Sequence, residues 1–370
     1  MNSSPHRIRN LRWWIAGLLA LATSLNYLDR QSFPVVVGEI RKEIALTDDD
    51  YGRLTSLFLC AYAIMYAGGG RLMDWLGARR GYAFMIVWWS AANLLTGAVR
   101  SVFGLGVFRF LLGVGEGGGF PGSAKAVAEW FPQHERSLAF GIFNAGSSIG
   151  AMIAPPLLAI VVTHLGWRWV FILTGSVGFV WALVWLFLYQ SPAASRFITA
   201  DERNFLAASI DGPVGSAVAS SDTRWLKLFR HREVQGLMVA KFLTDAAWYF
   251  LLFWLPKYLG DVRHLNIKEI GAFAWIPYAV SGVGSVAGGW LGSCLLRRGF
   301  SLDAARKIAL GIGAALMPAT LLIVASPLSW ALAIFSTAMS AHQFWSSTIQ
   351  TLPADLFPSR AVGSVGGLLG

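Results

Sequence analysis

Long apolar segments alternate with short polar ones along almost the whole chain. A helix needs about 20 predominantly apolar residues to cross a membrane. By that measure the pattern predicts ten spanning helices, over residues 13–37, 51–70, 82–99, 102–121, 137–162, 167–189, 234–256, 270–296, 306–325 and 330–352. An eleventh would begin at Ala361, and the chain stops at Gly370, in its first turns. We therefore expect a truncated chain, with a naturally short variant as the alternative.

A polar segment over residues 191–232 divides the predicted helices into six before it and four after it. It contains the small and polar stretch DGPVGSAVASSDTR, whose composition is typical of a flexible linker. The two sides echo each other, because GRLMDWLGARRG after the second predicted helix is matched by GWLGSCLLRRG after the eighth. Similarly, WFPQHERSLAFG is matched by LFPSRAVGSVGG. Internal repeats of this kind are the plan of secondary transporters.

The predicted architecture is an all-α polytopic membrane protein with two six-helix bundles, the second truncated so that about ten spans are present in all. Residues 1–190 would form the first bundle, 191–232 a cytoplasmic linker, and 233–370 the second bundle with the start of helix eleven. The composition agrees, since 55% of the residues are hydrophobic, 14% are charged and the mean hydropathy is +0.54. Soluble domains carry about 25% charged residues. We expect a monomer embedded in the lipid bilayer.

The net charge of +10 has a topological explanation. Most lysines and arginines lie in segments that share a side with the N-terminus, among them Arg7, Arg79 and Arg297. The positive-inside bias places that side, and the N-terminus with it, in the cytoplasm. The charge therefore does not indicate a nucleic-acid partner. Cys60 and Cys294 both fall inside predicted helices, which argues against a disulfide framework or a metal site.

The stretch from Gly70 to Gly81 resembles the loop signature of the major facilitator superfamily. Its matching residues are Gly70, Asp74, Gly77, Arg79 and Arg80. The glycines would allow close helix approach, and Asp74 would cap a helix end and pair with a cytoplasmic arginine, latching one state of a rocking cycle. The alternative is a plain basic loop that obeys the positive-inside bias. In the second copy Ser293 stands in place of Asp74, which predicts a weaker latch.

Ionisable residues also occur deep inside the predicted spans. They are Asp29, Arg30, Arg109, Glu116, Lys241 and Asp245. A charge near the bilayer centre costs about 2.5–3.5 kcal/mol on insertion scales, so it usually faces a partner or a cavity. Arg109 and Glu116 are two helical turns apart and share one face. Asn26 and Arg30, at a spacing of four, also share one face. We expect the charges of the first helix to oppose those of the fourth across a cavity.

An arginine and a protonatable carboxylate in a cavity suit the coupled movement of an anion and a proton. Arginine binds a carboxylate bidentately, and a carboxylate in a low-dielectric site can carry a proton. The alternative is a static salt-bridge network, although desolvation makes such networks poor stabilisers. Lys241 and Asp245, four residues apart, are explained equally by a local ion pair and by a role in binding. Trp248 is interpreted as a packing residue and His342 as structural.

Several stretches make the resemblance more specific. NYLDR in the first helix, RFLLGVGEGGGFPG in the fourth and FNAGSSIGAMIAPP in the fifth resemble the anion:cation symporter family of the major facilitator superfamily. KFLTDAAWYFLLFWLPKYL and HQFWSSTIQTLPADLFP resemble its bacterial hexuronate transporter branch. The match extends over essentially the whole chain.

This resemblance implies roles for particular residues. Arg30 would hold the substrate carboxylate, while Asp29 and Glu116 would take up and release the coupling proton. Arg109 would be the arginine that partners these acids. The cavity tyrosines near the substrate are matched by Tyr27 and Tyr62.

Four further residues would complete a sugar-acid site. Asn144 and Ser147, at positions i and i+3 of the fifth helix, could hydrogen-bond sugar hydroxyls. Ser147 replaces a glutamine of some sugar-acid members, which leaves the exact sugar open. Trp345 could stack on a pyranose ring to which Ser346 hydrogen-bonds.

The predicted function is proton-coupled symport of a small organic anion, such as the hexuronates glucuronate or galacturonate, across the bacterial inner membrane by alternating access. No cofactor is expected besides the coupling protons. The alternatives are a carrier of another organic anion or phosphate, and a transporter-like receptor for a sugar acid. Intact Asp29 and Glu116 argue against a receptor, because sensing needs no proton relay. An enzyme is not expected, because the chain contains no nucleophile elbow, His-Glu-x-x-His motif or phosphate loop.

Overall fold

The computed structural model describes residues 7–210, 231–264, 273, 275–357 and 359–369. Its elements are α1 (Leu11–Ile40), α2 (Asp48–Thr96), α3 (Val102–Glu116), α4 (Gly119–Trp130), α5 (Gln133–Leu165), α6 (Trp167–Leu188), α7 (Ala200–Ile210), α9 (Arg232–Lys257), the π-helical η1 (Tyr258–Val262), α11 (Trp275–Arg297), α12 (Leu302–Leu316), the 3₁₀-helical η2 (Met317–Leu322), α13 (Leu328–Ile349), α14 (Leu352–Leu356) and α15 (Ser359–Leu368). Over these ranges the only β-structure is an isolated bridge between Ile8 and Ile198. The expected all-α class is therefore confirmed.

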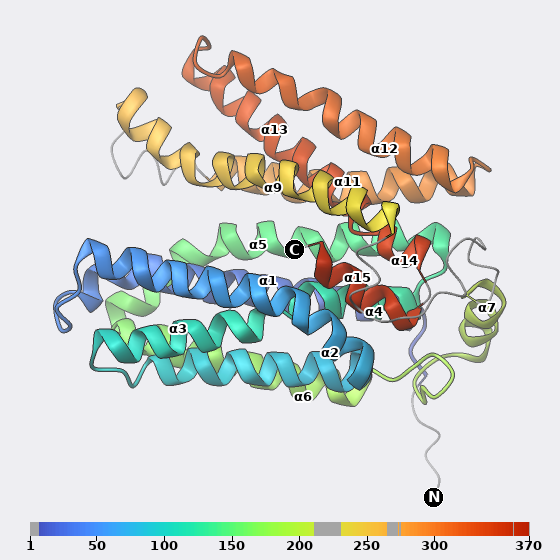
Figure 1. The fold of residues 1–370 in the computed structure, drawn as a ribbon, viewed down its shortest axis with the longest axis horizontal. Coiled ribbons are helices and arrows are strands. Elements are labelled where there is room, and N and C mark those ends of the chain that lie inside the picture. Colours follow the sequence, from blue (N-terminus) through green and yellow to red (C-terminus); the bar gives the residue numbers. More distant parts are fainter. Residues whose placement is uncertain (1–6, 211–230, 265–272, 274, 358, 370) are drawn as a thin grey trace, which may run out of the picture.

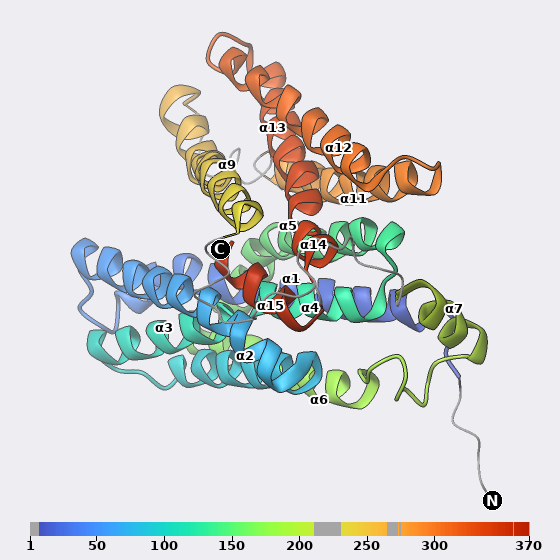
Figure 2. The same cartoon turned by 45° about the vertical axis from the view of Figure 1, so that its right-hand side comes forward.

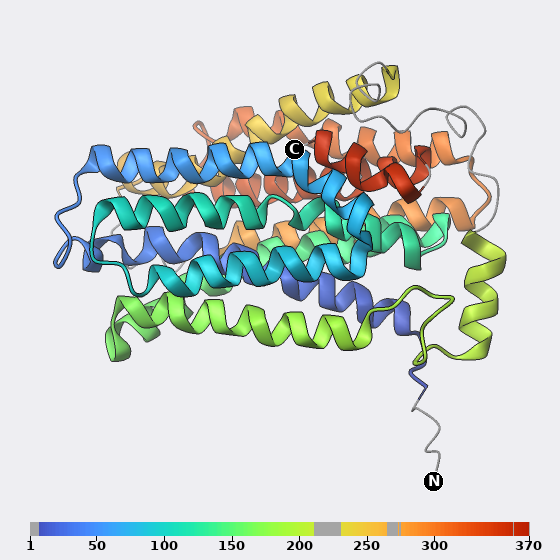
Figure 3. The same cartoon turned by 60° about the horizontal axis from the view of Figure 1, so that its bottom comes forward.

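The helices form two groups that lie side by side (Figures 1 and 2). The N-terminal bundle consists of α1 to α6, and the C-terminal bundle of α9, α11, α12 and α13. The N-terminus and α7 lie at the same end of the molecule, here called the α7 end (Figure 3). At this end the short α15 packs against α2 and α4 of the N-terminal bundle. The two bundles are thus also connected through the last helix that the structure describes.

Five helical segments within the described ranges are long and apolar enough to cross a membrane. They are Val102–Trp130, Gln133–Leu165, Trp167–Leu188, Trp275–Arg297 and Leu302–Leu322. The other long helices, α1, α2, α9 and α13, also coincide with predicted spans. They carry polar residues in their interiors, such as Asp29 and Arg30 in α1, which lower the mean hydropathy of any window that contains them.

Two predicted spans, 51–70 and 82–99, fall in the two helical parts of α2, which are separated by a kink. The chain turns within it at Gly77, where φ is 76° and ψ is 160°. Glycine adopts a positive φ at little steric cost, whereas other residues rarely do. A side chain at Gly77 would meet nothing within 4 Å. Gly77 therefore serves the backbone turn, and the expectation that it permits close helix approach is corrected.

The predicted linker is helical in part, since α7 lies within it. The stretch DGPVGSAVASSDTR, expected to be flexible, lies outside the described residues. Glu202 of α7 accepts hydrogen bonds from the backbone nitrogen of Leu11 at 2.9 Å and from Nη1 of Arg12 at 2.8 Å. A carboxylate is favourable there because the first amides of a helix lack intrahelical partners. These contacts attach α7 to the N-terminal bundle.

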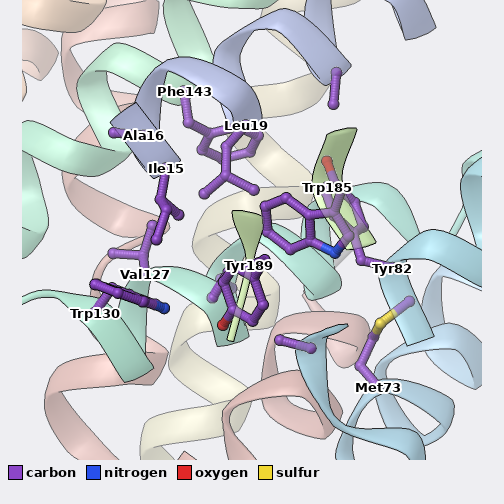
Figure 4. Packing of buried hydrophobic residues seen from close by; sticks show 14 of the residues in the cluster. Ile15, Ala16, Leu19, Met73, Tyr82, Val127, Trp130, Phe143, Trp185 and Tyr189 are labelled. Atoms are coloured by element: carbon purple, nitrogen blue, oxygen red, sulfur yellow. The ribbon is translucent and has the colours of Figure 1, made fainter. Parts of the chain in front are cut away.

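An aromatic core joins α6 to α2 (Figure 4). The rings of Trp185 and Tyr189 stack with centroids 4.1 Å apart, and Tyr82 meets Trp185 edge-on at 5.2 Å. Trp185 lies in the last turn of α6, and Tyr189 directly follows the helix as its C-cap residue. Aromatic pairs contribute about 0.5–1.5 kcal/mol beyond the burial of their area. This cluster therefore fixes α6 against α2.

Glycines around Glu116 bring α3 close to α2. A Cβ atom at Gly117 would lie 2.7 Å from the carbonyl oxygen of Tyr62, and one at Gly115 would lie 2.6 Å from Cβ of Trp89. Neither distance is tolerated without a shift of the backbone or of the neighbouring helix. The expectation that small residues beside Glu116 allow another helix to approach is confirmed.

Candidate functional site

A cavity of about 580 Å³ lies between the two bundles. Its size falls within the ~300–1,000 Å³ range of small-molecule sites. Among the substrate-binding candidates, the residues that line it are Tyr27, Arg30, Tyr62, Asn144 and Ser346. They come from α1, α2, α5 and α13, so both bundles contribute to one site.

Arg30 of α1 forms an ion pair with Glu116 at the end of α3. Its Nε donates to Oε2 of Glu116 at 2.7 Å. The side chain of Glu116 is fully buried, whereas that of Arg30 is 16% exposed and lines the cavity. The guanidinium therefore stands between the carboxylate and the cavity, where an anion from the cavity could also reach it.

Aromatic rings surround the same guanidinium. The Cζ atom of Arg30 lies 4.3 Å from the ring centroid of Tyr62 and 5.2 Å from that of Tyr27. Arginine stacks favourably on such faces. The two predicted cavity tyrosines therefore hold the guanidinium at the cavity wall.

Asp29 is buried inside the N-terminal bundle and is not among the cavity-lining residues of the described chain. Its Oδ1 accepts a hydrogen bond from Nδ2 of Asn93 at 2.7 Å, and this nitrogen is also 2.7 Å from Oγ1 of Thr174. Consecutive helical residues are rotated by about 100°, so Asp29 cannot share the direction of Arg30. The expectation that both charges of α1 face a cavity is corrected. Sequence reasoning missed Asn93, an uncharged residue in an apolar span.

Arg109 also lies apart from its expected partners. Its Cζ atom is 4.6 Å from the ring centroid of Phe58 and 4.9 Å from that of Phe33. Within the described part of the chain it forms no ion pair with Asp29 or Glu116, and its Nε and Nη1 have no hydrogen-bond partner. Seven helical residues span about 10 Å, which explains why Arg109 does not contact Glu116 directly.

Asn144 and Ser147 of α5 both meet Gln343 of α13. Nδ2 of Asn144 donates to Oε1 of Gln343 at 2.7 Å, and Nε2 of Gln343 lies 3.4 Å from Oγ of Ser147. Asn144 lines the cavity, whereas Ser147 is buried beside it. Sequence reasoning did not single out Gln343, which lines the cavity and connects the two bundles.

The two candidates on α13 face different ways. Ser346 lines the cavity and accepts a hydrogen bond from Nε2 of Gln350 at 2.8 Å. Trp345, one residue away, packs in an apolar cluster with Leu237 and Ile349 and is not among the cavity-lining residues that the structure describes. The expectation that Trp345 stacks on a sugar is therefore corrected.

The C-terminal wall of the cavity carries Lys241, Asp245 and Trp248 of α9 and His342 of α13. Lys241 pairs with Asp245, as expected for an i,i+4 pair. The ring of His342 stacks on that of Trp248 with centroids 5.0 Å apart. Trp248, interpreted from the sequence as a packing residue, is thus one of the aromatic residues that line the cavity on this wall, together with Phe242.

Asp74 of the loop signature connects the two bundles at the α7 end. Its oxygens accept hydrogen bonds from the backbone nitrogens of Gly363 and Ser364, at 3.2 and 2.7 Å, in the middle of α15. It also pairs with Nζ of Lys125 at 2.9 Å, where an arginine had been expected. A Cβ atom at Gly70 would overlap the carbonyl oxygen of Gly363, so Gly70 does permit close approach.

The signature arginines do not reach Asp74. Nη2 of Arg79 donates to the carbonyl oxygen of Leu186 at 2.6 Å, near the end of α6, and Arg80 is exposed. In the second copy, Oγ of Ser293 accepts a hydrogen bond from the backbone nitrogen of Leu138 at 3.1 Å. Each of the repeated positions therefore accepts a hydrogen bond from the backbone of a helix in the other half of the sequence, α15 for Asp74 and α5 for Ser293.

A buried charge cluster, not predicted from the sequence, closes the α7 end. Asp355 of α14 accepts a hydrogen bond from Nε of Arg306 at 2.9 Å and lies 3.7 Å from Nη1 of Arg136. Arg136 also donates to the carbonyl oxygen of Ala354. Arg136 belongs to α5 and Arg306 to α12, so the cluster ties the bundles together. The signal available in the sequence was the repeated Phe-Pro stretch that contains Arg136 and follows Asp355.

The described residues contain no group of three or more His, Cys, Asp or Glu side chains placed to hold a metal ion. Cys60 and Cys294 are both free thiols.

The chain resembles known membrane transporters in sequence and in fold. The sequence pattern of the Major Facilitator Superfamily matches residues 19–370. The chain is 33% identical over 369 residues to the hexuronate transporter of Escherichia coli (strain K12), covering 98% of this chain and 84% of the relative. It is 32% identical over 325 residues to the galacturonate transporter of Dickeya chrysanthemi, covering 87% of this chain and 94% of the relative.

The fold also matches solved structures. The proton:xylose symporter XylE, bound to 6-bromo-6-deoxy-D-glucose, superposes with a TM-score of 0.69 at 13% sequence identity, covering 97% of this chain and 85% of that one. At this identity the likeness concerns the fold alone.

Proposed function

Because the chain belongs to the major facilitator superfamily, we propose that it carries a small organic anion across the bacterial inner membrane together with protons, and that a hexuronate such as glucuronate or galacturonate is its substrate. The family and the likeness to hexuronate transporters, both expected from the sequence, are confirmed by the comparisons. They also confirm that the chain is an integral membrane transporter and not an enzyme.

The observation that carries the proposal is the position of Arg30 between Glu116 and the cavity. A substrate carboxylate and the carboxylate of Glu116 compete for one guanidinium. Protonation of Glu116 removes its negative charge, so Arg30 becomes available to clamp the substrate through a bidentate contact. Loss of that proton restores the competing anion and expels the substrate. One arginine thereby couples anion binding to proton binding.

The contacts between the bundles support an alternating-access cycle. The cluster around Asp355 and the hydrogen bonds that the amides of α15 donate to Asp74 hold the α7 end closed. The positive-inside bias supports a cytoplasmic α7 end, with the N-terminus inside. The described arrangement then corresponds to a cavity reached from the outside. Opening would require Arg136 and Arg306 to separate while a new contact forms at the opposite end.

Asp29 and Arg109 have supporting roles in this proposal. Asp29 would be a second proton site, held by Asn93 inside the bundle rather than exposed to substrate. Arg109, whose guanidinium lies over the rings of Phe33 and Phe58, would supply positive charge inside the bundle without pairing with either acid. Tyr27, whose ring lies beside Arg30, would help to position the substrate carboxylate.

Labelled uptake tests the proposal directly. Proteoliposomes that contain the chain are offered labelled glucuronate, galacturonate, galactonate and phosphate, each with and without an inward proton gradient. The proposal predicts concentrative uptake of a hexuronate that a proton uncoupler abolishes. Uptake of phosphate alone would overturn the substrate assignment, uptake that the uncoupler leaves unchanged would overturn proton coupling, and binding without transport would indicate a receptor.

A further inference from the structure

A polar cluster on the C-terminal wall of the cavity has no part in the proton cycle proposed above. Lys241, Asp245 and Trp248 lie three to four residues apart on one face of α9, and His342 approaches them from α13. All four line the cavity whose opposite wall presents Arg30.

Asp245 is the centre of this cluster. One carboxylate oxygen pairs with Nζ of Lys241, and the other lies 3.8 Å from Nε2 of His342. The side chain of Asp245 is 29% exposed, whereas that of Lys241 is 10% exposed. The cavity therefore meets the carboxylate more than the ammonium. One wall presents positive charge at Arg30, and the other presents negative charge at Asp245.

His342, beside Asp245, can form further hydrogen bonds through its ring nitrogens. The side chain of His342 is buried, and neither Nδ1 nor Nε2 has a hydrogen-bond partner of regular geometry among the described residues, although the backbone of Thr244 lies close to the ring. Buried polar atoms in folded proteins nearly always have a partner. The stacked ring of Trp248 fixes the plane of the imidazole, so its edge is held beside Asp245 at the cavity wall. A hydroxyl group of a bound molecule could satisfy it.

We propose that Asp245 selects sugar acids with a single carboxylate: Arg30 takes the carboxylate, while Asp245 and His342 take the hydroxyls at the other end of the molecule, and Asp245 excludes a second carboxylate by charge repulsion. This inference rests on the proposed function, because it requires a sugar acid anchored at Arg30.

The charge of Asp245 determines whether it contacts hydroxyl groups or a second carboxylate of the substrate. An ionised aspartate only accepts hydrogen bonds, and sugar hydroxyls donate them. A carboxylate in the same place would face a like charge, and this repulsion disfavours its binding. Selectivity by a repulsive group is a common device in specific binding sites. Neutralising Asp245 should reverse the preference, because Lys241 would then be free of its anionic partner and could bind a second carboxylate.

Galacturonate and galactarate serve as probes, since they share hydroxyl configuration and galactarate carries a second carboxylate in place of the carbonyl carbon through which galacturonate closes its ring; the comparison between variants cancels the effect of the ring itself. Counterflow of labelled galacturonate is measured in proteoliposomes, with each unlabelled acid as competitor. The wild-type protein should be inhibited at lower concentration by galacturonate than by galactarate. In Asp245→Asn the inhibitory concentration of galactarate, divided by that of galacturonate, should fall by about tenfold or more. A change of this size is expected for a charged hydrogen bond.

Two further variants control the experiment. Asp303 and Lys307 form an exposed i,i+4 pair on α12, at 2.8 Å, and they do not line the cavity. Asp303→Asn should therefore leave the ratio unchanged. The double variant Lys241→Gln with Asp245→Asn removes both charges, so it should lose the discrimination without gaining affinity for galactarate. It leaves no unpaired charge and tests the inference even where Asp245→Asn alone fails to insert.

Two results overturn the inference in distinguishable ways. If the wild-type protein exchanges galacturonate but the ratio in Asp245→Asn and in the double variant equals that in Asp303→Asn, Asp245 does not select the substrate, while the proposed function stands. If the wild-type protein exchanges no sugar acid at all, both the proposed function and the inference are wrong.

Discussion

The Nε atom of Arg30 lies 2.7 Å from Oε2 of Glu116, with the arginine at the cavity wall and the glutamate fully buried behind it. Among the described residues Glu116 does not line the cavity, so its carboxylate is separated from the cavity by the guanidinium of Arg30. An incoming anion therefore acts on Glu116 by engaging Arg30, and a proton on Glu116 acts on the anion in the same way. The proposed coupling of anion binding to proton binding therefore requires only the direct contact between Arg30 and Glu116.

Replacement of Arg30 by lysine tests the anion clamp. Lysine keeps the positive charge but loses the bidentate geometry and the stacking on Tyr62. Loss of a charged hydrogen bond is expected to weaken hexuronate binding by about tenfold to a hundredfold. Binding is measured by substrate-dependent thermal stabilisation of the purified protein, with the amount of folded protein matched. Wild-type affinity in Arg30→Lys would remove the clamp from the account.

Hydropathy was enough to predict the long helices, because a membrane requires long apolar helices whatever their partners. It did not show that α7 continues the first bundle, since the contact of Glu202 with the start of α1 depends on two segments far apart in sequence. The cluster of Asp355, Arg136 and Arg306 was missed for the same reason. From the sequence alone these residues are recognisable only as charged residues in the segments expected on the cytoplasmic side.

The candidate site was predictable in part. Buried charges stand out in an apolar sequence, so Arg30 and Glu116 were found and are paired. The direction in which each side chain points was not predictable, because a step of one residue turns it by about 100°. Asp29 and Trp345 therefore face away from the cavity, although their neighbours line it. Gln343 was overlooked because an uncharged amide among serines gives no comparable signal.

Alanine in place of Gly117 tests the close contact between α3 and α2. The added Cβ atom would lie 2.7 Å from the carbonyl oxygen of Tyr62, so the helices must separate. Overpacking of this kind costs about 1–3 kcal/mol. Gly17→Ala is the control, because a Cβ atom there meets nothing within 4 Å. Thermal unfolding in detergent should show a lower midpoint for Gly117→Ala only; equal midpoints would contradict the packing described.

Asparagine in place of Asp74 tests the contact with α15. The change removes the ion pair with Lys125 and weakens the bonds to the amides of Gly363 and Ser364. We expect a less stable closed α7 end and a lower initial uptake rate. Arg80→Gln changes the charge of the same loop at an exposed position and should have little effect. Equal losses in both variants would favour a plain basic loop over a specific latch.

Glutamine in place of Glu116 tests the coupling most directly. Glutamine imitates the protonated acid, so Arg30 remains available to the substrate and exchange between equal pools should be largely retained. Exchange returns the carrier loaded, and no proton needs to be released. Net uptake driven by a pH gradient requires the unloaded carrier to lose its proton, which glutamine prevents.

The decisive measurement is therefore paired counterflow and gradient-driven uptake of a hexuronate in the same preparation of Glu116→Gln proteoliposomes, with wild-type protein at equal density. The account predicts counterflow close to that of the wild-type protein and gradient-driven uptake no greater than in protein-free vesicles. A Glu116→Gln protein that still concentrates the hexuronate with the pH gradient would contradict the account and remove Glu116 from the coupling mechanism.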